Sequence, residues 1–394
     1  MNDVSRRSED PSISDWLLGE GRQLATPGEM LSGLCERLVQ QGVPIDRVGL
    51  HVRTLHPEVL ATRTLWQRGS QASLETLYAR SDPQEAFLRS PFFVVYDTGE
   101  TLRRRLDGST EDFDFPILAE LKAEGFTDYV VAPIRFGTGQ LHAATWASRR
   151  PGGFRDADLS TIAQLLPVLA VVTEVHEARR MTRTLLSTYL GPQTGIRVLN
   201  GTIRRGDGQT IAAALWYCDL RGFTAMSDAL PRDEVIALLN AYFERMAHPV
   251  QARGGELLKF IGDAILAIFP IADDLDRDRA CRTALDAAEA ALAELAELNT
   301  ARSAEGEPPL KIGIGLHMGA VMYGNIGAPG RLDFTVIGPA VNLVTRLESL
   351  CVVLGQPLLT SARFASPCGS KLVSLGRHPL KGITDPQEIF GLPH

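Results

Sequence analysis

Residues 215–269 constrain the fold more than any other part of the chain. They read as a strand ending at Asp219, a glycine-bearing turn, a helix, and two strands joined by Gly262 and Asp263. A Gly-Asp pair between two apolar runs is typical of a tight hairpin turn. This order places the end of one strand beside a hairpin tip, so we expect Asp219 and Asp263 to converge. Two carboxylates beside a turn that offers backbone amides predict a site for divalent cations and phosphate groups.

Three later segments extend the pattern: GIGLHMGAVMYGNIG (313–327), DFTVIGPAVNLVTRLE (333–348) and PLKGITDPQEIFGL (379–392). Together with the first stretch, and in the same order, they resemble the catalytic domain of class III nucleotide cyclases. These enzymes convert ATP or GTP into a cyclic monophosphate. The resemblance covers residues 205–394 and implies an α+β domain with ferredoxin-like βαββαβ topology.

The resemblance implies a role for each residue of the first motif. Asp219 and Asp263 would bind two divalent ions per active site, Mg²⁺ or Mn²⁺, with the Leu220 carbonyl as a further metal ligand. The backbone amides of the turn would donate to the β- and γ-phosphates of the substrate; these are the amides of Leu220, Arg221, Gly222, Phe223 and Thr224.

Lys259 and Thr335 stand where the family reads the purine. Lysine can donate to adenine N1, and threonine can accept from the 6-amino group. Guanylate cyclases of the family commonly carry Glu and Cys there. The pair therefore favours ATP as the substrate and an adenylate cyclase as the activity, with a guanylate cyclase as the alternative.

Three further residues match the family's phosphate and ribose contacts. Asn342 and Arg346 are four residues apart in a helical segment and project from one face. The resemblance assigns Asn342 to the ribose and Arg346 to the α-phosphate in the transition state, which suits the planar fork of a guanidinium. Lys381 matches the lysine that contacts the terminal phosphates.

In the family, the metal-binding aspartates come from one subunit, and the purine-reading and Asn-Arg pairs come from its partner. A chain that carries the full set implies a homodimer with two composite active sites. The alternative is a catalytically weak, nucleotide-binding dimeric regulator. Such relatives usually lack a metal aspartate or the arginine, and this chain keeps both.

Residues 16–154 resemble a GAF-type sensor domain in pattern alone, and a PAS-like domain fits nearly as well. We expect helices in 16–42, a strand pair in 48–66 around His56 and Pro57, and a strand at 92–96. A helix at 117–125 and a second strand pair in 128–148 should follow. Such α+β domains often bind a small molecule between the sheet and the variable middle segment, although the domain could instead only dimerise.

The remaining segments lie at the start and in the middle of the chain. Residues 1–15 are polar and predicted to be disordered. Residues 155–204 are predicted to be a connecting dimerisation helix and transducer element. Their apolar stripe suits pairing with a second copy, or packing on the helix's own domain; it comprises Ile162, Leu166, Leu169, Val172, Val175, Met181 and Leu185.

Composition excludes several other classes. The net charge of −7 gives no support to nucleic-acid binding. The longest apolar stretch, residues 162–175, is interrupted by Gln164, Pro167 and Thr173 and is predicted not to span a membrane. The five cysteines lack metal-ligand or disulfide spacing, which indicates reduced, buried thiols. We therefore expect a cytoplasmic protein.

Overall fold

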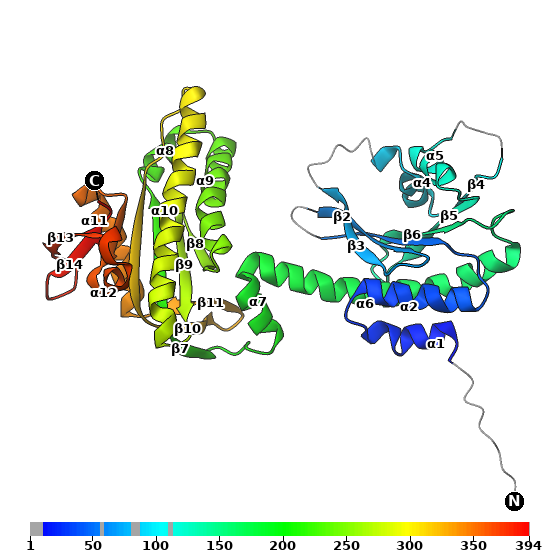
Figure 1. Cartoon of the computed structure of the whole chain (residues 1–394), viewed down its shortest axis with the longest axis horizontal. Helices are drawn as coiled ribbons and strands as arrows, with labels where there is room; N and C mark the ends of the chain where they lie inside the picture. Colours follow the sequence, from blue (N-terminus) through cyan, green and yellow to red (C-terminus); the bar gives the residue numbers. More distant parts are fainter. Residues whose placement is uncertain (1–10, 56–58, 80–86, 109–112, 394) are drawn as a thin grey trace, which may run out of the picture. The chain divides into compact units, whose positions relative to one another are not determined.

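The computed structural model describes residues 11–55, 59–79, 87–108 and 113–393 (Figure 1). The chain divides into two compact units, Met1–Leu185 and Leu186–His394. They are called the N-terminal and the C-terminal unit below.

The N-terminal unit is a three-layer α+β structure. Its sheet has six antiparallel strands in the order β3-β2-β1-β6-β5-β4. Helices α2 and α6 pack on one face, and α4 and α5 pack on the other. The elements are α1 (Ile13–Leu18), η1 (Gly21–Gln23), α2 (Pro27–Gln40), β1 (Arg47–Arg53), β2 (Val59–Gln67), β3 (Ser73–Ala79), α4 (Pro91–Thr98), β4 (Leu102–Arg105), α5 (Pro116–Ala123), β5 (Asp128–Arg135), β6 (Leu141–Ser148) and α6 (Asp156–Leu190).

The predicted early helices, both strand pairs and the helix at 117–125 are confirmed. The strand predicted at 92–96 is wrong, because these residues lie in α4. Pro91 occupies the first turn of that helix and Gly99 ends it with φ 71°, a pairing of start and stop signals that outweighs the β propensity of Phe-Phe-Val-Val-Tyr. The GAF-type assignment stays a prediction.

The predicted disordered segment is only partly described. Residues 1–10, like the turn at His56 and Pro57, lie outside the described residues. Ile13 already begins α1, whose first turn is capped by the Ser12 hydroxyl, and the Ile13 side chain is buried. The ordered structure therefore begins before residue 16.

Helix α6 continues through Pro167 for 35 residues. The interruptions do not exclude this helix as a membrane span: by length and composition it could cross a membrane, alone among the described helices. The prediction that it does not span one stays a prediction. A core helix meets the same criteria, and Ile162, Leu169 and Val172 are buried in the unit's own core. The first half of the predicted stripe therefore packs on its own unit, and pairing with a second copy stays a prediction for the second half.

The C-terminal unit is also α+β. Its elements are α7 (Pro192–Leu199), β7 (Gly208–Leu220), α8 (Phe223–Ala229), α9 (Arg232–Ala252), β8 (Glu256–Ile261), β9 (Ala264–Ile271), α10 (Asp274–Ala304), β10 (Ile312–Ala328), β11 (Arg331–Ile337), α11 (Pro339–Leu354), β12 (Leu358–Ser361), α12 (Ala362–Ala365), η2 (Ser366–Lys371), β13 (Val373–His378) and β14 (Gln387–Gly391). The central strands follow the order β10-β7-β9-β8, and neighbouring strands are antiparallel. With α9 and α10 between them in sequence, they form the predicted ferredoxin-like βαββαβ core.

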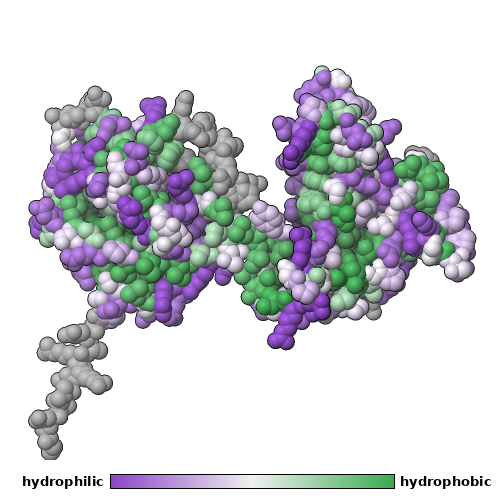
Figure 2. Space-filling view, turned by 180° about the vertical axis from the view of Figure 1, so that it is seen from behind, coloured by the Kyte–Doolittle hydropathy of each residue, from purple (hydrophilic) through white to green (hydrophobic). Residues whose placement is uncertain are grey.

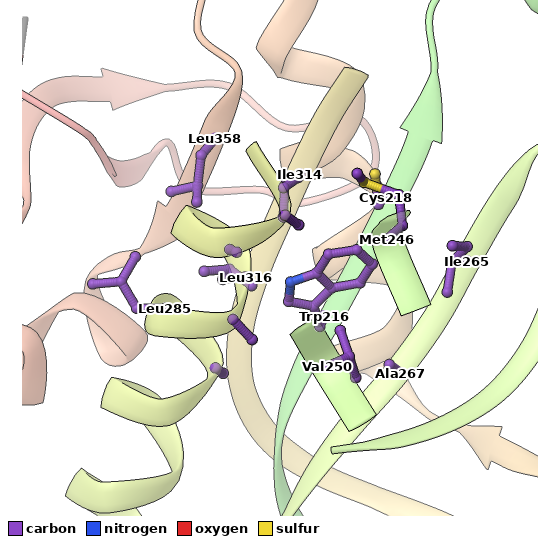
Figure 3. Close-up of a cluster of buried hydrophobic side chains, with 14 of the residues drawn as sticks. Trp216, Cys218, Met246, Val250, Ile265, Ala267, Leu285, Ile314, Leu316 and Leu358 are labelled. Carbon is purple, nitrogen blue, oxygen red and sulfur yellow. The ribbon is translucent and has the colours of Figure 1, made fainter. Parts of the chain in front are cut away.

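Trp216 lies at the centre of this core (Figure 3). It is fully buried on β7 and packs in one cluster with Met246 and Val250 of α9 and Leu285 of α10. Helix α11 covers the opposite face of the sheet. A Cβ atom on Gly315 of β10 would lie 2.4 Å from the Val344 carbonyl oxygen, so glycine is required for α11 to approach the sheet this closely. All five cysteines are buried and free, as expected.

Candidate active site

Asp219 and Asp263 meet at one edge of the central strands. Asp219 is the penultimate residue of β7, and Asp263 lies in the two-residue turn between β8 and β9. Gly262 supplies the positive φ of this turn, 63°. Burial, followed by the charge of the Asp263 carboxylate and a hydrogen bond with it, raises the pKa of Asp219 to about 7. The predicted convergence of the two side chains is therefore present.

The pair has the donor chemistry that a divalent cation needs. Two carboxylates that are close enough to share a hydrogen bond repel each other unless a proton or a cation lies between them. Mg²⁺ and Mn²⁺ prefer oxygen ligands and commonly take only one or two protein carboxylates. Within the described residues, no group of three or more His, Cys, Asp or Glu side chains could hold a metal. A carbonyl such as that of Leu220, water or substrate oxygens would have to complete the coordination.

The turn after β7 begins α8. Gly222 has φ 73° and is followed directly by the helix, whose first N–H groups have no acceptor within the helix. The Arg221 amide differs from the others, because it donates to the Lys311 carbonyl oxygen at 2.7 Å. The amide is therefore paired in the sheet in this structure, and its predicted contact with phosphate stays a prediction. The remaining predicted donors lie at Leu220, Gly222, Phe223 and Thr224.

The Arg221 side chain reaches α11. Its Nη1 lies 2.6 Å from Glu348 Oε1, and its Nη2 donates to the Glu348 carbonyl oxygen at 2.8 Å. The Glu348 side chain is only 4% exposed, so this ion pair is held inside the unit. A Cβ atom on Gly313 would lie 1.7 Å from Arg221 Nη2. The absence of a side chain at Gly313 therefore makes room for the pair, which joins the turn to the helix that carries Asn342 and Arg346.

Lys259 lies on β8 and pairs with β11, the strand that carries Thr335. Its Nζ is 2.7 Å from Asp333 Oδ2, and this hydrogen bond lowers the pKa of Asp333. Asp333 and Thr335 are two residues apart on one strand and point to the same face. The structure thus brings Lys259 to the face of Thr335, as the purine-reading role requires.

Asn342 and Arg346 both lie on α11, where Asn342 is exposed and Arg346 is half-buried. A Cβ atom on Gly382 would lie 3.3 Å from Arg346 Nη2. The guanidinium therefore lies beside the loop between β13 and β14, which carries the exposed Lys381. Arg346 therefore lies beside the loop of Lys381, the other side chain predicted to bind phosphate groups.

The sequence prediction missed Asp333, Glu348 and Gly313. Asp333 had a local signal, since an acidic residue two positions before Thr335 on a strand shares its face. Glu348 and Arg221 are 127 residues apart, and only the tertiary fold shows that they meet.

The chain is similar to nucleotide cyclases. The model of the adenylate and guanylate cyclase catalytic domain matches residues 208–388. Adenylate cyclase 1 of Rhizobium meliloti (strain 1021) is 28% identical over 266 residues, which are 64% of this chain and 38% of that protein. The adenylate cyclase of Anabaena cylindrica is 37% identical over 157 residues, 40% of this chain and 31% of that protein. The chain thus spans about a third of the length of these curated relatives.

Among solved structures, the adenylyl cyclase CyaB from P. aeruginosa is 28% identical with a TM-score of 0.44, and the match covers 48% of this chain and 96% of that one. The match to the family model includes β7, the β8–β9 hairpin, α11 and the Lys381 loop. Residues 208–388 of this chain therefore belong to the adenylate and guanylate cyclase catalytic domain family.

Proposed function

We propose that the chain is an adenylate cyclase that converts ATP into 3′,5′-cyclic AMP and pyrophosphate. The observation that carries the proposal is the meeting of Asp219 and Asp263 beside the turn that begins helix α8. Two curated relatives are named adenylate cyclases. The pairing of Lys259 with the strand of Thr335 supports adenine over guanine, since lysine can only donate.

The reaction is an attack of the ribose 3′ oxygen on the α-phosphorus, in which the 3′ proton is lost and pyrophosphate leaves. Asp219 and Asp263 would hold two divalent ions, Mg²⁺ or Mn²⁺, which when bound neutralise phosphate charge and lower the pKa of the 3′ hydroxyl. The amides of the turn bind the β- and γ-phosphates.

The other side chains orient the substrate and stabilise the transition state. Lys259 and Thr335 hold the adenine, and Asn342 holds the ribose. Arg346 stabilises the negative charge that develops on the α-phosphate in the transition state, and Lys381 binds the terminal phosphates.

The active unit in this proposal is a homodimer with two composite sites, each built from the aspartates of one subunit and the purine-reading and Asn-Arg pairs of the other. Large apolar side chains are exposed next to these pairs: Phe260 (52%) and Ile261 (48%) follow Lys259, and Ile337 (44%) follows Thr335. Exposed apolar surface of this kind supports a subunit contact. Figure 2 also shows hydrophobic side chains, interspersed with hydrophilic ones, on the visible face of the C-terminal unit.

We further propose that the N-terminal unit is a GAF-like sensor that regulates the cyclase, with α6 and α7 as the connection. The protein would act in the cytoplasm, with ATP and a second copy of the chain as its partners and without nucleic acid.

The test is a cyclase assay on the full chain with ATP or GTP and with Mg²⁺ or Mn²⁺. We expect cyclic AMP from ATP, no product after EDTA treatment, and recovery when the metal is restored. Cyclic GMP formed in excess over cyclic AMP at equal concentrations of GTP and ATP would identify a guanylate cyclase. Tight ATP binding without any product would identify a nucleotide-binding regulator and would contradict the proposal.

A further inference from the structure

The N-terminal unit contains a cavity of about 340 Å³ between one face of its sheet and helices α4 and α5. This volume lies within the range of small-molecule sites in proteins. A Cβ atom on Gly49 of β1 would lie 2.7 Å from both His51 Nε2 and Thr145 Oγ1. Glycine at this position therefore leaves the polar atoms of the sheet face uncovered.

The lining carries an excess of positive charge. Arg47 and Arg63 lie on the neighbouring strands β1 and β2, and Arg89 lies just before α4. Among the described residues of the lining, the carboxylate is that of Glu120, which is exposed. The Arg47 side chain is only 15% exposed, and its Nη1 lies 3.9 Å from the Glu124 carboxylate, beyond hydrogen-bond distance. The part-buried Arg47 guanidinium, with this loose pairing, favours an anion in the cavity.

His51 adds a buried polar group that is only partly satisfied. It is 4% exposed, and its Nε2 lies 3.2 Å from Thr145 Oγ1. Its Nδ1 has no hydrogen-bond partner among the described residues. Burial, together with the charges of Arg63 and Arg47, lowers the pKa of His51, so the ring is neutral and offers one hydrogen bond. Buried polar atoms are nearly always paired, and one left over at a cavity wall points to a ligand atom.

Most of the rest of the lining is apolar, although Ser90 and Tyr129 also belong to it. The Phe92 ring packs on the His51 ring with their centroids 4.1 Å apart, and Leu65, Ile117 and Leu121 also line the cavity. A ligand that fills the cavity must therefore combine a charged group with an apolar body.

We propose that this cavity binds a small organic anion, whose carboxylate or phosphate group is held by Arg47, Arg63 and Arg89 and whose apolar or aromatic body packs against Phe92. His51 and Thr145 supply the polar contact at the sheet. The proposal concerns the N-terminal unit alone and does not depend on the reaction of the C-terminal unit.

The test uses three probes that share a phenyl ring: benzoate, phenyl phosphate and benzamide, which is the neutral counterpart of benzoate. Binding to the full chain is followed by ligand-observed NMR, and hydrogen exchange of peptides from β1 and α4 locates the site. We expect at least one anion to bind one-to-one and to protect these peptides, with benzamide at least roughly tenfold weaker, as loss of a charged hydrogen bond implies. The anion that binds more tightly shows whether the cavity prefers a carboxylate or a phosphate group.

Variants then assign the binding to the arginines. Arg47→Gln should weaken binding of the anion by roughly tenfold. Arg89→Gln, at an exposed position where folding tolerates the change, should also weaken binding. Arg105→Gln is the matched control, because Arg105 lies on the same sheet and pairs with Asp107 at 2.8 Å; it should leave binding unchanged. The proposal is overturned if neither anion binds at millimolar concentration, if benzamide binds equally well, or if Arg47→Gln and Arg89→Gln both leave binding intact.

Discussion

At the scale of single residues, the metal-binding role rests on two carboxylates, and the charge of Asp263 helps to raise the pKa of Asp219. We predict that Asp263→Asn lowers cyclase activity by more than roughly 100-fold, because a neutral amide is a poor ligand for Mg²⁺ and leaves Asp219 alone. The measurement is the initial rate of cyclic AMP formation. Asp286→Asn, a surface aspartate that pairs with Lys371, is the control. Full activity in Asp263→Asn would contradict the assignment.

The ion pair of Arg221 and Glu348 gives a second prediction. Arg221→Met leaves the Glu348 carboxylate, 4% exposed, without its partner. Loss of one member of a buried pair costs about 3 kcal/mol in the free energy of unfolding. The double variant Arg221→Met with Glu348→Leu should recover most of this loss, because no buried charge is left.

The measurement is hydrogen exchange of β7 and α11 peptides across a urea series, which reports on the C-terminal unit separately. Lys371→Met breaks an exposed pair with Asp286 and should change the stability by less than about 1 kcal/mol. A similarly small change for Arg221→Met would show that the pair does not hold α11 to the turn.

At the scale of elements, α7 is tied to the cyclase sheet through one buried carboxylate. Glu256 of β8 is 6% exposed and accepts from Thr194 Oγ1 of α7 at 3.0 Å and from Tyr323 Oη of β10 at 2.7 Å. The Arg197 guanidinium lies over the Tyr323 ring, 4.8 Å from its centroid. Helix α7 is thus bound to the strand that carries Lys259.

We predict that Thr194→Val loosens α7 without unfolding the sheet. The lost hydrogen bond contributes about 1 kcal/mol, so the amides of residues 192–199 should exchange roughly fivefold faster. Hydrogen exchange of the full chain measures this effect. Thr210→Val, at an exposed strand position, should leave α7 unchanged. If the α7 amides exchange equally fast in both variants, the hydrogen bond to Glu256 does not hold α7 to the sheet.

The elements also differ in how far they could be predicted from the sequence. The strand ending at Asp219 and the hairpin at Asp263 were predictable, because glycine turns and apolar runs lie next to each other in sequence. Strands β3 and β4 were not predicted. They lie at the two edges of their sheet, where the strand conformation depends on the neighbouring strand more than on local propensity. The pairs of Arg221 with Glu348 and Thr194 with Glu256 likewise join distant segments.

At the scale of the whole molecule, the proposed composite sites make activity a property of two chains. One chain carries both halves of the site: the aspartates with their turn, and Lys259, Asn342 and Arg346 with the Lys381 loop. If each site takes one half from each subunit, a defect in one half can be complemented by a partner with a defect in the other half.

We therefore predict that Asp219→Ala and Arg346→Ala, each inactive alone, regain activity when mixed. A heterodimer then has one site with both defects and one intact site. Random exchange makes about half of the dimers heterodimers, so the mixture should reach about a quarter of the activity of the unmodified protein. Mixing Asp219→Ala with Asp263→Ala is the matched control and should stay inactive, because both defects fall in the same half. Recovery in the control, or none in the first mixture after proven subunit exchange, would reject shared sites.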